Sequence, residues 1–255
     1  MPLLSGPALV LHVMPYGETS KIVRLLTRDW GLASGLARGA RGRKSRTGPR
    51  LDLFAAGTAS LLVKDTRDLH PLTAFEITAP HAALAHDVGR FAAASTLVEL
   101  ALRCAPDEPR PEIHDAVAHG LDALEAAPGD LVDAVALLAV WALVVSLGFA
   151  PSLDRCAVCG RAAAAGGDLA FSPEQGGALC ATHRPSAPYR QLRAADAAAL
   201  GALASGRLPE PPLDPRHAAA HRRLLVAFIR HHLAEHRALP ALAFWDSESW
   251  HATSS

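Results

Sequence analysis

The stretches ALVLHVM at residues 8–14 and IVRLL at residues 22–26 decide the fold class of the amino-terminal part of the chain. Both are rich in aliphatic and β-branched residues, which favour strands. Three further strands are predicted at residues 32–40, 58–64 and 72–78, and the turn RDWG at residues 28–31 precedes the first of them. Five short strands without intervening helices predict a five-stranded OB-type β-barrel, because closure removes exposed strand edges. An SH3-like barrel remains the alternative.

The hydrophobic period changes near residue 81. Apolar residues then recur at i, i+3, i+4 and i+7 in residues 90–104, 113–126 and 131–147, which predicts three helices. The third segment is apolar nearly all round, so we expect it to be the central helix of its domain. Helices are predicted again at residues 194–203 and 216–237, separated by a proline-rich linker at residues 208–215. The fold class is therefore α+β.

Composition alone does not favour a nucleic-acid binder, but the distribution of charge does. The 255 residues are half hydrophobic and carry 25 basic and 25 acidic side chains. Residues 1–80 hold eleven Lys and Arg against six Asp and Glu, whereas the remainder holds fourteen against nineteen. No secretory signal is recognisable, and the apolar run at residues 134–145 is too short to span a bilayer. We expect a cytoplasmic, nucleoid-associated protein with no membrane partner.

The positive charge is concentrated in the stretch RGARGRKSRTGPR at residues 38–50, which contains no acid. Cations this close repel one another, so the stretch is predicted to be a loop that polyanion phosphates stabilise. Lys21 and Arg24, with Arg28, extend this patch if strand alternation points them to it. Only the rings of Trp30 and Phe54 lie nearby in sequence, so binding should be led by the DNA backbone and tolerant of sequence. The predicted DNA-binding residues are Lys21, Arg24, Arg38, Arg41, Arg43, Lys44, Arg46 and Arg50.

A second motif lies further along the chain, where CAVC at residues 156–159 and CATH at residues 180–183 are separated by twenty residues. Two residues between ligands let a tight turn aim both at one ion, and the second pair completes a tetrahedron. The sequence therefore predicts structural Zn²⁺ held by Cys156, Cys159, Cys180 and His183. Four protein ligands leave no open coordination position for catalysis. The remaining cysteine, Cys104, is expected to be a core residue.

Several stretches resemble enzyme motifs but lack a required residue or have it at the wrong position. GARGRKS at residues 39–45 has Arg43 where a phosphate-binding loop needs glycine. GLASG at residues 31–35 places its serine one position away from a nucleophile elbow, and HLAEH at residues 232–236 misplaces the glutamate of a zinc protease. His217 and His221 lie four apart, but a solvated basic helix with Arg216, Arg222, Arg223 and Arg230 is the simpler interpretation. We predict that the protein is not an enzyme.

We call the motifs CAVC and CATH the two knuckles. The order of barrel, basic loop, helices and knuckles resembles the RecO family of bacterial recombination mediators across most of the chain. The matching stretches are YGETS at 16–20, LTRDWGL at 26–32, ARGAR at 37–41, LGFAP at 147–151 and FSPE at 171–174. The resemblance implies a protein that binds single- and double-stranded DNA, anneals complementary strands and, with RecR, promotes RecA loading onto DNA coated by single-strand-binding protein. The family's fourth knuckle ligand is a cysteine, which is replaced here by His183. A pocket for the acidic carboxy-terminal tail of single-strand-binding protein is implied in the helical region, with Arg222, Arg223 and Arg230 as candidates.

These expectations define four parts of the chain and two rival functions. The parts are an OB-fold DNA-binding domain at residues 1–80, a first helical part at 81–149, a zinc-binding insertion at 150–190, and a second helical part with the carboxy-terminal tail at 191–255. One rival is a zinc-containing transcription regulator that binds duplex DNA, which would need a base-reading helix. The other is a nuclease or other metal enzyme, which would need an open metal position and clustered carboxylates.

Overall fold

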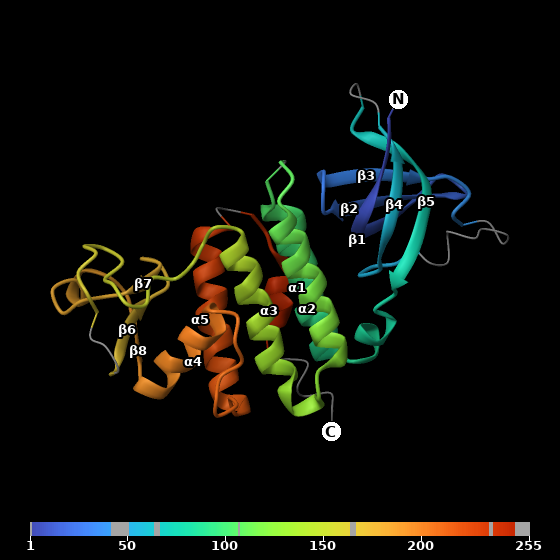
Figure 1. Cartoon of the computed structure of the whole chain (residues 1–255). Coiled ribbons are helices and arrows are strands. Elements are labelled where there is room, and N and C mark those ends of the chain that lie inside the picture. The colour runs from blue at the N-terminus through green and yellow to red at the C-terminus, as the bar shows by residue number, and fades with distance from the viewer. Residues whose placement is uncertain are drawn as a thin grey trace. The chain divides into compact units, whose positions relative to one another are not determined.

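The computed structural model describes residues 2–41, 51–63, 67–106, 108–163, 167–234 and 237–247. The chain divides into two compact units, unit 1 at residues 1–125 and unit 2 at residues 126–255. Unit 1 holds the barrel strands β1 to β5 and the first helices (Figure 1). Its elements are β1 (Leu3–Tyr16), β2 (Ser20–Thr27), β3 (Gly31–Ala37), β4 (Ala56–Leu62), β5 (Leu69–Ala79), a 3₁₀ helix at Ala82–His86, α1 (Val88–Cys104) and α2, which begins at Pro111 and ends at Ala126.

The five strands of unit 1 form a closed barrel in the order β1-β2-β3-β5-β4. The long strand β1 closes it, because its first half pairs with β4 and its second half with β2, with an irregularity between Val10 and His12. Strands β3 and β5 pair in parallel, and the other pairs are antiparallel. This arrangement confirms the OB-type barrel that the sequence predicts. The core contains aliphatic side chains from every strand, among them Val10, Val23 and Leu61.

Helix α1 covers part of the outside of this barrel. Leu9 and Leu26 lie opposite each other on β1 and β2, and both are fully buried although neither belongs to the barrel core. Because side chains alternate along a strand, these two leucines face outward, where α1 packs against β1 and β2. The ring of Phe54 meets that of Phe91 on α1 at 5.6 Å. Helix packing therefore covers one end of the outer face of β1 and β2.

Unit 2 is built around α3 (Val132–Ser146), which follows a 3₁₀ turn at Gly129–Leu131. The ring of Trp141 is fully buried and contacts Phe228 at 5.2 Å. Residues Gly129–Ser146 are long and apolar enough to cross a membrane by length and composition, but half of this segment is buried inside the protein. A core helix of a globular protein has the same composition. The packing of Trp141 supports the prediction that this is the central helix.

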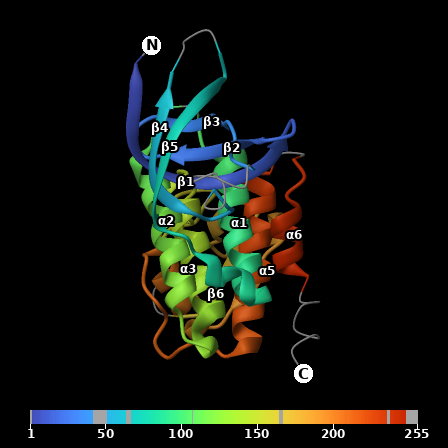
Figure 2. The same cartoon turned by 90° about the vertical axis from the view of Figure 1, so that its right-hand side faces the viewer.

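The rest of unit 2 consists of a small sheet and three helices. The sheet has the order β7-β6-β8, and α6 packs beside α5 (Figure 2). The sequence shows little helical pattern at residues 150–190, and the structure places most of this small sheet there. Helix α5 ends at His232 and not at residue 237, and α6 was not predicted. The bounds are β6 (Leu169–Ser172), β7 (Gly177–Ala178), a 3₁₀ turn at Arg184–Ser186, β8 (Arg190–Leu192), α4 (Ala194–Ala204), α5 (Pro215–His232) and α6 (Pro240–Asp246).

Candidate nucleic-acid interface and metal centre

Strand alternation separates the two basic residues predicted on β2. Val23 and Leu25 belong to the barrel core, so Lys21 lies on the same face of the strand as they do, at its end. Its ammonium group donates a hydrogen bond to the carbonyl oxygen of Leu51 at 3.0 Å. Arg24 lies on the outer face, where its guanidinium donates to the hydroxyl of Ser34 at 2.7 Å. Arg24 is therefore held on the outer surface of the sheet, whereas Lys21 stands at the end of the barrel.

Two residues at the basic stretch belong to the barrel core. Ala40 lies within the stretch and Leu51 directly after it, and both are buried members of that core. Arg38 and Arg41 are exposed, and the backbone N–H of Arg41 donates to the carbonyl oxygen of Thr19 at 2.8 Å. The β1–β2 turn and the start of the basic stretch are thereby joined. Arg43, Lys44, Arg46 and Arg50 lie outside the described residues.

Arg28 has a partner that the sequence did not suggest. Its Nε and Nη2 atoms donate to the two carboxylate oxygens of Asp115 on α2, each at 2.9 Å. This bidentate hydrogen bond from Arg28 lowers the pKa of Asp115 to about 2. The charge of Arg28 is therefore balanced within unit 1, and the residue serves to join the β2–β3 turn to α2.

The pair predicts an acid-sensitive contribution to stability. Because the folded-state pKa of Asp115 is depressed, the contribution is complete above the ordinary value of 3.8 and is lost as pH falls towards 2. We expect Asp115→Asn to lower the urea midpoint at pH 6 by the equivalent of about 1 kcal/mol, since the pair is partly exposed. At pH 2, which is near the folded-state pKa of Asp115, most of this difference between the variant and the parent should be gone. A difference that persists unchanged at pH 2 would show that the charge of Asp115 is not the cause.

Trp30 and Phe54, the two rings near the basic stretch in sequence, offer little surface for stacking on bases. Phe54 retains 2% of its surface and is packed on Phe91, and Trp30 is partly buried against the barrel core. Sequence reasoning missed Tyr16, whose side chain is 53% exposed at the end of β1. The alternation of side chains along β1 could have identified Tyr16, since Val13 faces the core and the even-numbered residues after it face outward.

Tyr16 belongs to a row of outward-facing side chains on three neighbouring strands. Met14 on β1 lies opposite Ile22 on β2, which lies opposite Leu36 on β3. His12, Arg24 and Ser34 form the next rung of the same face. We call this surface the platform. Its members are His12, Met14, Tyr16, Ile22, Arg24, Ser34 and Leu36.

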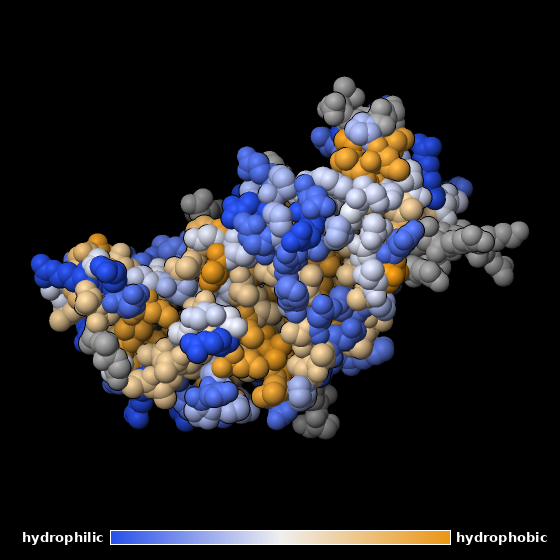
Figure 3. Space-filling view, in the orientation of Figure 1, coloured by the Kyte–Doolittle hydropathy of each residue, from blue (hydrophilic) through white to orange (hydrophobic). Residues whose placement is uncertain are grey.

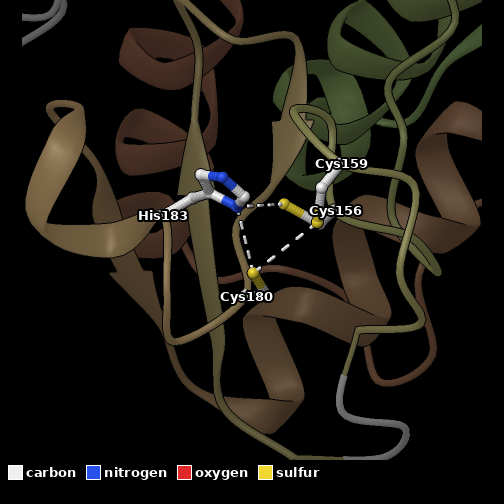
Figure 4. A group of neighbouring side chains, drawn as sticks. All are labelled: Cys156, Cys159, Cys180 and His183. Carbon is white, nitrogen blue, oxygen red and sulfur yellow. Dashed lines mark hydrogen bonds between the residues drawn. The ribbon is translucent and has the colours of Figure 1, made fainter.

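The three cysteines and the histidine of the two knuckles come together in unit 2 (Figure 4). All four ligand atoms lie within 4.8 Å of one another. The sulfur of Cys159 is 3.9 Å from that of Cys180, and Nδ1 of His183 is 3.6 Å from the sulfur of Cys156. A tetrahedral zinc ion with bonds of about 2.3 Å to sulfur and about 2.0 Å to nitrogen would separate its ligand atoms by about 3.5–3.8 Å. The cluster fits such an ion.

The local backbone explains how the knuckles form. Gly160 has φ 69°, which a residue with a side chain rarely adopts, and its N–H donates to the carbonyl oxygen of Cys156 at 2.8 Å. At the second knuckle the N–H of His183 donates to the carbonyl oxygen of Cys180 at 3.0 Å. Each pair of ligands is thus fixed on one tight turn. The backbone N–H of Ala157 in the first turn donates to the carbonyl oxygen of Ala178 on β7 at 2.8 Å, which holds the first turn beside the second.

The electrostatics of the cluster favour thiolates at Cys156 and Cys180. At Cys159 the backbone N–H of Arg161 lowers the pKa, but desolvation and the neighbouring sulfurs of Cys156 and Cys180 outweigh it and raise the pKa. Burial raises the pKa of Cys156, but backbone N–H groups of Cys180, Cys159 and Val158 outweigh this effect and lower the pKa to about 6. A hydrogen bond with His183 lowers the pKa of Cys180 and raises that of His183. Thiolates are the form that binds metal, so the site can hold a metal ion and should release protons when it does.

The sequence predicts that α5 is a solvated basic helix, but only some of its basic side chains are exposed. Arg222 retains 2% of its surface and lies 3.5 Å from a carboxylate oxygen of Asp133 on α3, so the expectation is wrong for this residue. Arg230 is 3.2 Å from a carboxylate oxygen of Asp246. His221 is also buried, and burial lowers its pKa. Arg223 is exposed and lines a cavity of about 300 Å³ together with Arg190 and Leu192.

Unit 2 also contains a larger cavity, of about 890 Å³, between α3, α4 and the proline-rich stretch. Its floor is the alanine-rich face of α4, and apolar surface is visible over the helices of this unit (Figure 3). Asp196, Glu210 and Asp214 line it. The two cavities thus differ in their balance of charge. Three carboxylates and one arginine, Arg207, line the larger cavity, whereas two arginines and one carboxylate, that of Asp196, line the smaller.

Comparison with known proteins agrees with this geometry. The family model "Recombination protein O N terminal" matches residues 1–81, and "Recombination protein O C terminal" matches residues 85–240. The protein named DNA repair protein RecO in Anaeromyxobacter sp. (strain K) is 36% identical over 242 residues, which cover 93% of each chain. The protein of that name in a Nocardioides species is 34% identical over 250 residues, covering 95% of this chain and 98% of its own. The chain therefore belongs to the RecO family of DNA repair and recombination proteins.

Proposed function

We propose that the protein is a non-enzymatic recombination mediator that binds single- and double-stranded DNA and anneals complementary strands. The observation that carries this proposal is the platform on β1, β2 and β3, which adjoins a basic stretch anchored to the barrel at Ala40 and Leu51. Cations that replace condensed counterions supply affinity without reading sequence. A surface that holds two strands close reduces their repulsion and raises their encounter frequency, so annealing requires no catalytic group.

The metal site supports a structural role in this scheme. We infer that Cys156, Cys159, Cys180 and His183 hold Zn²⁺, because three thiolates and one imidazole form the donor set of structural zinc. The ion would fix the two knuckles and leave no position open for substrate. With this assignment the chain has the four parts predicted above, at residues 1–80, 81–149, 150–190 and 191–255.

We propose that protein partners bind to the helical and zinc-binding parts. These are RecR, the carboxy-terminal tail of single-strand-binding protein and, indirectly, RecA, in the cytoplasm at the nucleoid. The lining of the larger cavity has more carboxylates than arginines, which disfavours an acidic tail, whereas Arg190 and Arg223 outnumber Asp196 in the smaller one, which favours it. Of the three arginines suggested by the sequence, Arg223 is therefore the candidate we retain for tail binding.

Oligonucleotide binding measured against salt tests the proposal. If about four phosphates are neutralised, log affinity for a single strand should fall with log salt at a slope of roughly three. Affinity should not depend on base sequence, and annealing of complementary strands should accompany binding. Sequence-selective binding to duplex would instead favour the transcription regulator, and strand cleavage would favour a metal enzyme.

The platform makes a separate prediction for unpaired strands. Tyr16→Ala should weaken single-strand binding by about 5- to 100-fold, because stacking of a base on an aromatic ring contributes about 1–3 kcal/mol. Duplex affinity should change little, since paired bases are not available to stack. Tyr16→Phe should retain binding, and Tyr189→Ala, which removes the other exposed tyrosine ring, is the matched control. Equal losses on single strands and duplex, measured by fluorescence anisotropy, would contradict stacking.

A further inference from the structure

The ligands of the metal site differ in their exposure to solvent. Cys156 retains 2% of its surface and packs with Ala170 and Leu179 in the small core of the zinc-binding part. Cys159 is exposed, and Cys180 is partly buried. In the zinc-loaded site all three cysteines are held as thiolates, so the order in which they are oxidised follows their accessibility. A dissolved oxidant should therefore reach the sulfur of Cys159 first.

The partner for an oxidised Cys159 is already close. The sulfur atoms of Cys159 and Cys180, which belong to different knuckles, lie 3.9 Å apart (Figure 4). A disulfide requires about 2.0 Å, so a relative shift of about 2 Å is sufficient.

We propose that Cys159 and Cys180 form a peroxide-sensitive modification site that controls whether the protein retains its metal. The Cys159 thiolate attacks one oxygen of hydrogen peroxide, the O–O bond breaks, and hydroxide leaves, which produces a sulfenic acid. The Cys180 thiolate then attacks the sulfenic sulfur, and a second hydroxide leaves as the S–S bond forms. Two thiolates have together lost two electrons, and one peroxide has been reduced.

Metal release follows from the ligands that remain. Only Cys156 and His183 are left, and two protein ligands do not complete the tetrahedron of a structural zinc site. Because metal binding is coupled to folding of the segment that carries it, release should loosen the zinc-binding part. The barrel has its own core in unit 1 and should keep its DNA affinity. Peroxide would then alter the surface offered to protein partners while DNA binding continues. The inference rests on the proposed zinc site.

The test uses the full-length, zinc-loaded protein and hydrogen peroxide. Zinc release is followed with a chromogenic chelator, and the cysteines are mapped by mass spectrometry of proteolytic peptides. We expect one zinc ion released per chain and a cross-linked peptide pair joining Cys159 to Cys180. Cys104→Ser, which removes the only cysteine outside the cluster, should behave like the parent. Cys159→His keeps a ligand that peroxide does not convert to a disulfide, so release should slow by at least about tenfold.

The outcomes separate the two proposals. A protein that is zinc-loaded and keeps its ion in peroxide overturns the modification site and leaves the zinc assignment intact. A disulfide between Cys156 and Cys159 also overturns the named pair, as does oxidation of Cys159 without a cross-link. A protein that binds no zinc overturns both proposals before peroxide is added. If Cys159→His binds no zinc, the peptide map of the parent protein still decides.

Discussion

A variant in which Arg38, Arg41, Arg43, Lys44 and Arg46 are all alanine is expected to lose strand annealing. Its affinity for oligonucleotides in dilute buffer should fall at least about 100-fold, because each lost cation removes a phosphate contact and the counterions that the contact releases. The slope of log affinity against log salt should fall from about three to about one or less. Annealing kinetics with complementary labelled strands, together with anisotropy titrations at several salt concentrations, measure both effects.

The control for this experiment changes the same number of charges elsewhere. Arginines that are exposed and lie outside the barrel are replaced by alanine, and this variant should anneal like the parent. Equal loss of annealing in both variants would mean that net charge alone, not the basic stretch, determines binding. Unchanged annealing in the first variant would overturn the proposed interface. The control positions are Arg110, Arg161, Arg193, Arg207 and Arg216.

Cys156→Ser is expected to abolish stoichiometric zinc binding. Cys156 is the buried ligand, with backbone N–H groups directed at its sulfur, and a serine hydroxyl there does not ionise at neutral pH. Because zinc binding is coupled to folding, residues 150–190 should exchange their amide hydrogens much faster, whereas the barrel should not. Metal analysis and hydrogen exchange of the full chain measure both effects, and a chelator applied to the parent should reproduce them.

The matched control is Cys104→Ser, which changes a partly buried cysteine on α1 in the other unit. It should leave the zinc content at one ion per chain and the exchange of residues 150–190 unchanged. Full zinc content in Cys156→Ser would remove this residue from the site. Faster exchange throughout the chain would show that the zinc-binding part and the barrel are not independent.

Local patterns in the sequence were sufficient for the barrel strands, for most of the helices and for the cluster that could hold a metal ion, but not for β6–β8 or α6. The alternation in ALVLHVM and the helical period after residue 81 reflect burial of one face, which is a property of neighbouring residues. The start of α4 at Ala194 and the end of α1 at Cys104 were predicted to the residue. The spacing of Cys156 and Cys159 likewise fixes a turn that needs no distant contact.

The sequence predicted the location of the positive charge but not the ion pairs that balance part of it. Sequence located the cationic stretch, since it depends on composition alone. It did not show that Arg28 is balanced by Asp115, because that partner lies 87 residues away. It also did not show that Arg222 is buried near Asp133 on a different helix. The charge of a side chain follows from its residue type, whereas its ion-pair partner is brought to it by the packing of the folded chain.

Sequence patterns alone predict a five-stranded barrel with a basic stretch, a set of helices and a Cys-Cys-Cys-His cluster that could hold a metal ion. Packing in the folded chain covers Phe54, partly buries Trp30 against the barrel core and leaves Tyr16 as the exposed ring on the platform. The physical reason is that hydrophobic periodicity and ligand spacing act over a few residues. Which face of a strand another element covers depends on contacts between distant parts of the chain, and those contacts exist only in the folded protein.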